Sequence, residues 1–274
     1  MALQKTLIVI GGPTASGKTA LAIELARHFG TEIVSADSRQ IYREMTIGTA
    51  KPTPEELAAV PHHFIDSHSI HDTYSAGQYE RDALVLLERL FSQHDVVVAA
   101  GGSGLYLKAL MEGLDDFPEI PPEVEHEVEA LFAEKGLPAL QEQVARADPA
   151  YYEVVDRHNP ARLLRALKVI RATGRPFSAF RKSRPAPRPW RQVPVLLMPE
   201  REALYARINR RAEAMIETGL LDEVRRLYPY RHLRPLQTVG YQEFFPWIEG
   251  SRTLEEAIRL FKRNTRRYAK RQMT

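Results

Sequence analysis

Residues Gly12–Thr19, GPTASGKT, match the pattern G-x-x-x-x-G-K-[ST] of a phosphate-binding loop. The glycines let such a loop turn its backbone N–H groups around phosphate oxygens, the lysine adds a positive charge, and the last hydroxyl can bind Mg²⁺. The flanking residues fit this loop: Thr6–Ile10 (TLIVI) is typical of a strand buried on both faces, and apolar residues recur at helical spacing from Leu21 to Phe29. We therefore expect a di- or triphosphate site at the edge of a parallel α/β sheet.

Two further segments repeat the pattern of a strand followed by a turn. Ile33–Ser35 is predicted to be a strand that ends just before Asp37, and Val96–Ala100 (VVVAA) a strand followed at once by GGSG. Residues 78–93 between them have the periodicity of an amphipathic helix. Strands that alternate with helices indicate a parallel sheet with crossover helices. The predicted fold class is α/β, with a P-loop NTPase-like parallel sheet core.

The sequence changes character after about Leu114. Residues 115–122 are acidic and proline-rich, and helical patterns follow without a convincing strand until Val193–Met198. Prolines among residues 183–189 indicate a second boundary. We expect residues 1–114 and 190–274 to form the α/β core with basic C-terminal helices, and residues 115–189 to form a helical insertion domain.

Composition excludes several classes of protein. The 274 residues are 44% hydrophobic and 27% charged, close to globular averages, which excludes a fibre or a disordered chain. No apolar run approaches the roughly 18 residues of a membrane span. Because the chain has no cysteine, disulfide scaffolds and thiolate metal sites are excluded as well. We expect a cytoplasmic monomer that does not associate with membranes.

The positive charge is concentrated near the C-terminal end of the sequence. The net charge is only +3, but residues 259–271 contain no acid. Their basic residues are Arg259, Lys262, Arg263, Arg266, Arg267, Lys270 and Arg271. Such a segment indicates a polyanionic partner, although a solvated helix face explains it equally well.

The residues around the loop argue against nucleotide hydrolysis. Hydrolases usually carry a magnesium-supporting acid at the end of a strand, whereas Val96–Ala100 runs into two glycines. Asp37, in ADSRQIY, follows a strand at the sheet edge where ligands of open α/β folds bind. It could serve as a general base, a magnesium ligand or a helix cap.

Five blocks of sequence together resemble one known family. They are GPTASGKT; ADSRQIY with IGTAKP (47–52); PHHFID (61–66); GGSGLYLKAL (101–110); and VGYQEF (239–244). Over nearly its whole length the chain resembles the tRNA dimethylallyltransferases, also called tRNA isopentenyltransferases. The resemblance implies a prenyltransferase that moves a dimethylallyl group from dimethylallyl diphosphate to N6 of the adenosine 3′ of the tRNA anticodon, releasing diphosphate. It also implies the tRNA anticodon stem-loop as a partner and Mg²⁺ as a cofactor.

The resemblance assigns roles to single residues. Asp37 would accept the proton of the adenine amine, Thr19 would bind Mg²⁺, and Arg207 would contact the diphosphate. The residues expected to hold that diphosphate are Gly12, Pro13, Thr14, Ala15, Ser16, Gly17, Lys18 and Thr19. From the sequence alone, Arg207 cannot be chosen over Arg201, Arg210 or Arg211, which are most simply explained as solvated helix charges.

The family likeness also implies contacts with tRNA, since the adenine has to leave the anticodon stack to reach the base. The residues concerned are Asp37, Ser38, Arg39, Gln40, Ser103, Ala161, Arg162, Leu163, Leu164, Arg165, Gly240, Tyr241, Gln242, Arg263, Arg266 and Arg267. The ring of Tyr241 suits an unstacked base, but core packing explains it equally well. Core packing is also the alternative for Leu163 and Leu164.

Two other functions share part of this evidence. A P-loop small-molecule kinase would need the loop and the strand order, but neither the VGYQ block nor the basic segment. A nucleotide-dependent RNA-binding module would use the VGYQ block and the basic segment, but would carry out no transfer chemistry. Transfer of label from dimethylallyl diphosphate to tRNA separates the three.

Overall fold

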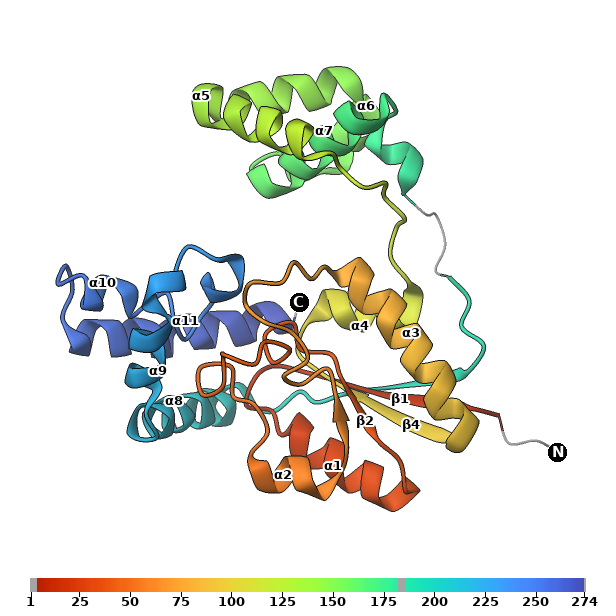
Figure 1. Cartoon of the computed structure of the whole chain (residues 1–274), viewed down its shortest axis with the longest axis vertical. Coiled ribbons are helices and arrows are strands. Elements are labelled where there is room, and N and C mark those ends of the chain that lie inside the picture. The colour runs from red at the N-terminus through yellow and green to blue at the C-terminus, as the bar shows by residue number, and fades with distance from the viewer. Residues whose placement is uncertain (1–3, 182–185, 274) are drawn as a thin grey trace. The chain divides into compact units, whose positions relative to one another are not determined.

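The computed structural model describes residues 4–181 and 186–273, and the chain divides into two compact units (Figure 1). The first unit is Met1–Gly113 with Pro187–Thr274, and the second is Leu114–Ala186. The predicted insertion, 115–189, overlaps the second unit. Of the proline-rich boundary predicted at 183–189, residues 183–185 lie outside the described residues.

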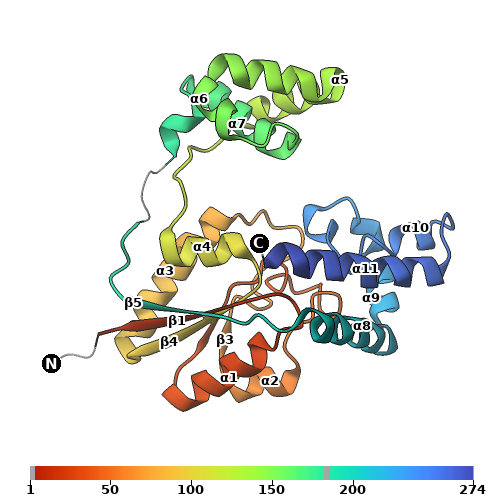
Figure 2. The same cartoon turned by 180° about the vertical axis from the view of Figure 1, so that it is seen from behind.

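The first unit contains a five-stranded parallel sheet in the order β3-β2-β4-β1-β5 (Figure 2). The strands are β1 Thr6–Gly11, β2 Ile33–Ser35, β3 His62–His63, β4 Val96–Ala100 and β5 Arg191–Leu196. Ile8 of β1 pairs with Val98 on one side and with Val193 on the other. The first three predicted strands are confirmed, and β5 begins two residues before the predicted Val193. The two-residue β3 is too short to give a periodic signal.

Helices cover both faces of this sheet. Helix α1 (Lys18–Phe29) packs on one face, where Ala22 and Ala26 contact the side of the sheet that carries Ile8 and Val98. Helices α3 (Ala76–Gln93) and α4 (Gly104–Glu112) lie on the other face (Figures 1 and 2). This alternation follows from the two-residue period of a strand. Burial on both faces explains why these strands are apolar throughout.

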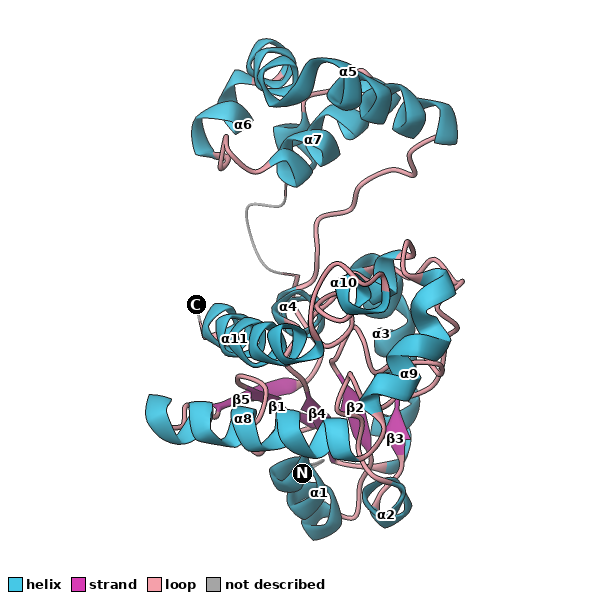
Figure 3. Cartoon of the chain, turned by 90° about the vertical axis from the view of Figure 1, so that its left-hand side faces the viewer, coloured by secondary structure: helices cyan, strands magenta, loops and turns pink. Residues whose placement is uncertain are grey.

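The C-terminal helices lie in front of the carboxyl ends of the strands (Figure 3). They are α8 Arg201–Glu217, α9 Leu220–Leu227, α10 Phe245–Ile248 and α11 Leu254–Gln272, with 3-10 turns at Tyr228–Tyr230 and Arg234–Leu236. Lys262 of α11 pairs with Glu213 of α8, and Arg266 donates to Asn209. In these two pairs the residue numbers rise along α11 as they fall along α8, so the two helices are antiparallel. Helix α2 (Pro54–Ala59) precedes β3 and begins with a capping box at Thr53.

The second unit is helical throughout its described residues. It contains α5 Pro122–Ala147, α6 Pro149–Val154, α7 Pro160–Thr173 and a 3-10 turn, Phe177–Phe180. Asn159 caps α7 by accepting from the backbone N–H of Arg162, and Gly174 ends it with φ of 67°. Leu140 and Leu163 lie at the centre of its core. In neither unit does a described helix combine the length and the apolar character of a membrane span.

Candidate functional site

Three turns meet at the carboxyl edge of the sheet. They follow β1, β2 and β4 and comprise residues 12–17, 36–40 and 101–103. The backbone N–H of Ser38 donates to Ser103 Oγ at 2.9 Å, and the N–H of Ser103 donates to the carbonyl of Ala36 at 3.2 Å. A Cβ atom on Gly101 would lie 2.1 Å from that carbonyl oxygen, so only glycine permits this approach. Motifs that are separated in the sequence therefore form one contiguous site.

A cavity of about 460 Å³ opens over these turns. Its walls come from the phosphate loop (Gly12–Thr19), the turn around Asp37, the 48–50 segment, and one side of each of α8 and α11. Its volume lies in the range of roughly 300–1,000 Å³ of small-ligand sites.

The phosphate loop has the backbone that its glycines allow. Gly17, with φ of 96°, is the N-cap of α1, so the loop runs directly into the start of a helix. Gly12 has φ of 146°, and a Cβ there would lie 2.6 Å from the carbonyl oxygen of Leu197. A side chain at either position would distort the loop. The free N–H groups and the dipole at the start of α1 favour an anion.

Four cations, Lys18, Arg39, Arg207 and Arg211, line the cavity. Lys18 Nζ donates to the carbonyl of Pro13 at 2.7 Å. Burial lowers the pKa of Lys18 to about 8; nearby Asp37 raises it and Arg211 lowers it further. The Nε of Arg207 is buried and has no hydrogen-bond partner among the described residues. Positive groups gathered in a desolvated site are stabilised by an anionic ligand.

Arg211 corrects an expectation from the sequence. We expected a solvated helix charge, but its side chain lies in the cavity wall and donates to Thr14 Oγ1 of the phosphate loop. Burial lowers the pKa of this guanidinium. The signal that could have found it is the spacing of four residues from Arg207, which places both on one side of α8.

Asp37 lies in the cavity wall between the phosphate loop and the 48–50 segment. Its Oδ1 accepts from the backbone N–H groups of Arg39 at 2.9 Å and Gln40 at 3.3 Å. The predicted capping role is thus realised in a turn and not at a helix. No described residue donates to Oδ2, so this oxygen can take a proton. Capping and base chemistry are compatible in one carboxylate.

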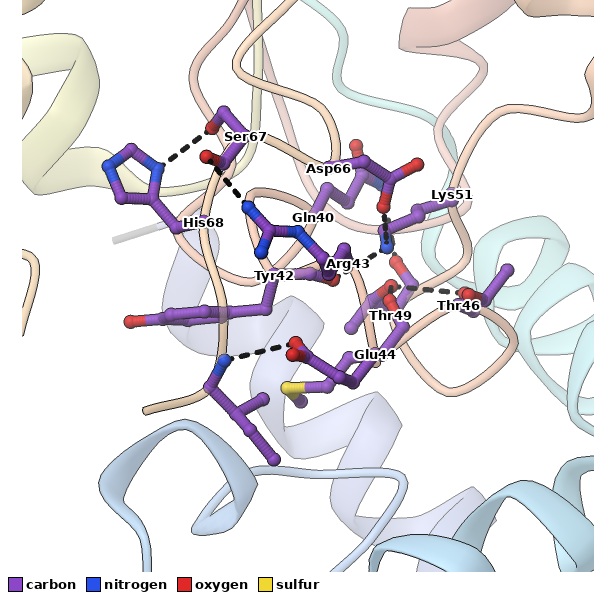
Figure 4. Close-up of polar contacts among 12 residues, drawn as sticks. Gln40, Tyr42, Arg43, Glu44, Thr46, Thr49, Lys51, Asp66, Ser67 and His68 are labelled. Carbon is purple, nitrogen blue, oxygen red and sulfur yellow. Dashed lines mark hydrogen bonds and ion pairs between the residues drawn. The ribbon is translucent and has the colours of Figure 1, made fainter. Parts of the chain in front are cut away.

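Hydrogen bonds and an ion pair fix the segment that follows Asp37 (Figure 4). Gln40 Nε2 donates to the carbonyl oxygens of Thr49 at 3.2 Å and Ala50 at 3.0 Å. Lys51 Nζ, on a side chain only 3% exposed, donates to the carbonyl of Tyr42 at 2.6 Å and pairs with Asp66. The blocks IGTAKP and PHHFID therefore hold this segment in place.

Tyr241 corrects a second expectation. Its side chain is fully buried, and its hydroxyl donates to Glu223 Oε1 at 2.6 Å. The buried Glu223 carboxylate also accepts from the N–H groups of Thr46, Ile47 and Gly48. The prediction that this ring stacks on an unpaired base is wrong, because no part of it is accessible. Gly240 is buried too, whereas Gln242 is exposed.

The basic segment divides into two sets of side chains on α11. Lys262 and Arg266 bind Glu213 and Asn209, and so attach α11 to α8. Arg267 and Lys270 are exposed. Of the three predicted RNA contacts, Arg267 is exposed and Arg263 and Arg266 are half-buried, and these contacts remain predictions.

The residues predicted to contact tRNA in the second unit also divide by burial. Ala161, Arg162 and Arg165 are exposed, whereas Leu163 is fully buried and Leu164 packs against the same core. The expectation that the Leu163 side chain touches tRNA is wrong, because that side chain is enclosed by this unit's own helices.

The cavity could hold Mg²⁺ only together with a ligand. The described residues contain no group of three or more His, Asp or Glu side chains placed to hold a metal. Thr19 and Asp37 both line the cavity and offer a hydroxyl and a carboxylate. This oxygen set suits Mg²⁺, which usually binds through one or two carboxylates plus substrate phosphates.

Comparison with known proteins assigns the chain to a family. The model of the family described as IPP transferase matches residues 40–274. The chain belongs to the IPP transferase family. A tRNA dimethylallyltransferase of Christiangramia forsetii is 51% identical over 98% of this chain and 89% of its own length. One of Cytophaga hutchinsonii is 48% identical over 99% and 90%.

Solved structures of IPP transferase relatives share the fold. A full-length tRNA isopentenylpyrophosphate transferase of Bacillus halodurans is 36% identical, with a TM-score of 0.67 over 98% of this chain and 86% of that one. A eukaryotic dimethylallyltransferase acting on tRNA is 26% identical, with a TM-score of 0.83 over 98% and 69%. The predicted fold class, a P-loop NTPase-like α/β core, is confirmed.

Proposed function

We propose that this protein transfers a dimethylallyl group from dimethylallyl diphosphate to N6 of the adenosine 3′ of the anticodon in tRNA, releasing diphosphate. Family membership supports the reaction. The choice of donor is supported by one observation: the side chains of α8 that line the cavity change from cationic to apolar along the helix.

Arg207, Arg211 and Met215 follow one another at intervals of four residues and line the same cavity. Phe261 and Tyr268 line it from α11. Because α8 and α11 are antiparallel, Met215 lies at the same end as Phe261. Arg211 contacts the phosphate loop, and the end with Met215 and Phe261 lies about one helical turn further from that loop. The cavity thus offers cations to a diphosphate and an apolar wall to a hydrocarbon.

The length of the apolar part suits a short prenyl group. Four helical residues span about 6 Å, so Met215 lies about one turn beyond Arg211. A five-carbon prenyl group is of about this length.

The chain's own groups account for the transfer. The bond between donor C1 and the diphosphate oxygen breaks, a bond from C1 to adenine N6 forms, and Asp37 takes the proton that N6 loses. Lys18, Arg207 and Arg211 stabilise the negative charge that develops on the departing diphosphate. Thr19, together with diphosphate oxygens, would hold Mg²⁺, which would neutralise part of the same charge.

On the RNA side, we propose that the anticodon stem-loop binds the turn of Asp37–Gln40 near Ser103, the exposed Arg162 and Arg165, and the exposed face of α11. The exposed arginines suit RNA phosphates. We also propose that the protein is a monomer and that, as a relative of tRNA-modifying enzymes, it acts in the cytoplasm.

The experiment is a label-transfer assay with radiolabelled dimethylallyl diphosphate and unmodified tRNA. We expect label to enter tRNA with the wild-type protein, and Asp37→Asn to reduce the rate by at least about a hundredfold while tRNA affinity persists. Phosphorylation of a small acceptor by ATP would instead support a kinase. RNA binding without transfer would support a binding module, and full activity of Asp37→Asn would remove Asp37 as the base.

A further inference from the structure

The last turn of α11 reaches the phosphate loop through one side chain. Gln272 Oε1 accepts from the backbone N–H of Thr14 at 2.8 Å, and Gln272 Nε2 donates to the carbonyl of Gly102 at 2.8 Å. A Cβ atom on Gly102 would lie 2.4 Å from that Nε2, so the amide is packed closely onto this turn. Both ends of one amide are therefore bonded to different turns of the site.

The two turns serve different substrates under the proposed function. Thr14 belongs to the loop for the departing diphosphate. Gly102 belongs to the turn that Ser103 ties to Ser38, and so to the segment that carries Asp37. Within the described part of the chain, no other side chain has a hydrogen bond to both of these turns. Gln272 is thus a direct link between the donor side and the acceptor side.

We propose that Gln272 is a positioning residue that sets the separation between the diphosphate loop and the acceptor turn. This inference rests on the proposed function. Transfer needs donor C1 and adenine N6 about 3–3.5 Å apart and aligned with the breaking bond, and a misplacement of about 1 Å can slow a reaction by about a hundredfold. The pairing of β1 with β4 already joins the bases of the two turns, where the N–H of Gly101 donates to the carbonyl of Ile10 at 3.1 Å. The Gln272 amide bonds the turns further out, at Thr14 and Gly102, and so holds these parts at one distance.

Two variants separate its two hydrogen bonds. Gln272→Met keeps the length of the side chain and removes both bonds. Gln272→Glu keeps the acceptor for Thr14 but replaces the donor to Gly102 by a negatively charged oxygen. A matched control is Gln93→Met, the same chemical change at an exposed glutamine at the end of α3.

The measurement is the single-turnover rate of label transfer at saturating tRNA and dimethylallyl diphosphate. We expect both Gln272 variants to be about 10- to 100-fold slower, with tRNA affinity within about twofold of wild type. Affinity for inorganic diphosphate without RNA should change by less than about tenfold. Gln93→Met should leave both the tRNA affinity and the saturated rate unchanged.

Three results would overturn the inference. The first is a saturated rate of Gln272→Met within about twofold of wild type. The second is a loss of inorganic diphosphate binding that accounts for the whole effect, because the loop itself would then have collapsed. The third is a wild-type protein that transfers no label, which would overturn the proposed function as well. The first two leave that function standing.

Discussion

At the scale of single residues, Lys18 makes donor binding sensitive to pH. Burial lowers the pKa of this lysine from 10.5 to about 8 in the protein without ligand. As pH rises through about 8, the folded protein loses this charge before the unfolded chain does. Between these two values stability therefore rises with pH, while attraction for a diphosphate falls.

We expect the donor dissociation constant, measured without RNA, to be constant below pH 8 and to rise toward about tenfold per pH unit above it. The matched control is Lys18→Arg, whose guanidinium stays charged and should flatten the profile. A wild-type constant that does not change across this window would contradict the assignment of Lys18 to the diphosphate.

Tyr241 tests whether a residue of the VGYQ block binds RNA or supports the loop. Tyr241→Phe leaves the buried Glu223 carboxylate without one of its donors, so the free energy of unfolding should fall by about 1–3 kcal/mol in urea denaturation. Affinity for tRNA should not change, since the ring is inaccessible. Gln242→Ala, at an exposed position, should weaken tRNA binding and leave the free energy of unfolding unchanged. Weaker tRNA binding by Tyr241→Phe at unchanged stability would contradict this role.

At the scale of elements, the sequence predicts what is local and misses what depends on partners far along the chain. The phosphate loop, the strands and the position of Asp37 follow from spacing and periodicity within about thirty residues. The burial of Arg211 depends on the loop it contacts, 197 residues away in sequence. Similarly, the buried Tyr241 ring lies against Gly48, far earlier in the sequence, and Gln272 lies 258 residues from Thr14. No local pattern encodes these contacts.

The apolar end of α8 should limit the length of the donor. Met215→Ala enlarges that end of the cavity, so we expect the ratio of transfer from geranyl diphosphate to transfer from dimethylallyl diphosphate to rise by at least about tenfold. Met215→Leu keeps the volume and should keep the ratio. The measurement is kcat/KM for each donor with the same tRNA. An equal loss with both donors would show that Met215 does not set this length.

At the scale of the whole molecule, each of the two units carries exposed basic residues that the proposal assigns to one tRNA. Arg162 and Arg165 belong to the second unit, and Arg267 and Lys270 to the first. If a single tRNA contacts both units, the phosphates neutralised by each pair add in the salt dependence of binding. Each lost phosphate contact lowers the slope of log affinity against log salt by about 0.7–0.9.

We therefore expect Arg162→Gln with Arg165→Gln to reduce the magnitude of that slope by about 1–2, and Arg267→Gln with Lys270→Gln to do the same. The four substitutions together should reduce the slope by the sum of the two separate reductions. Lys168→Gln is the control in the second unit. Because Lys168 already pairs with Glu129 at 2.6 Å, this substitution should leave the slope unchanged. An unchanged slope for the Arg162 and Arg165 pair would remove the second unit from RNA binding, while a combined effect smaller than the sum would mean that the two pairs share phosphates.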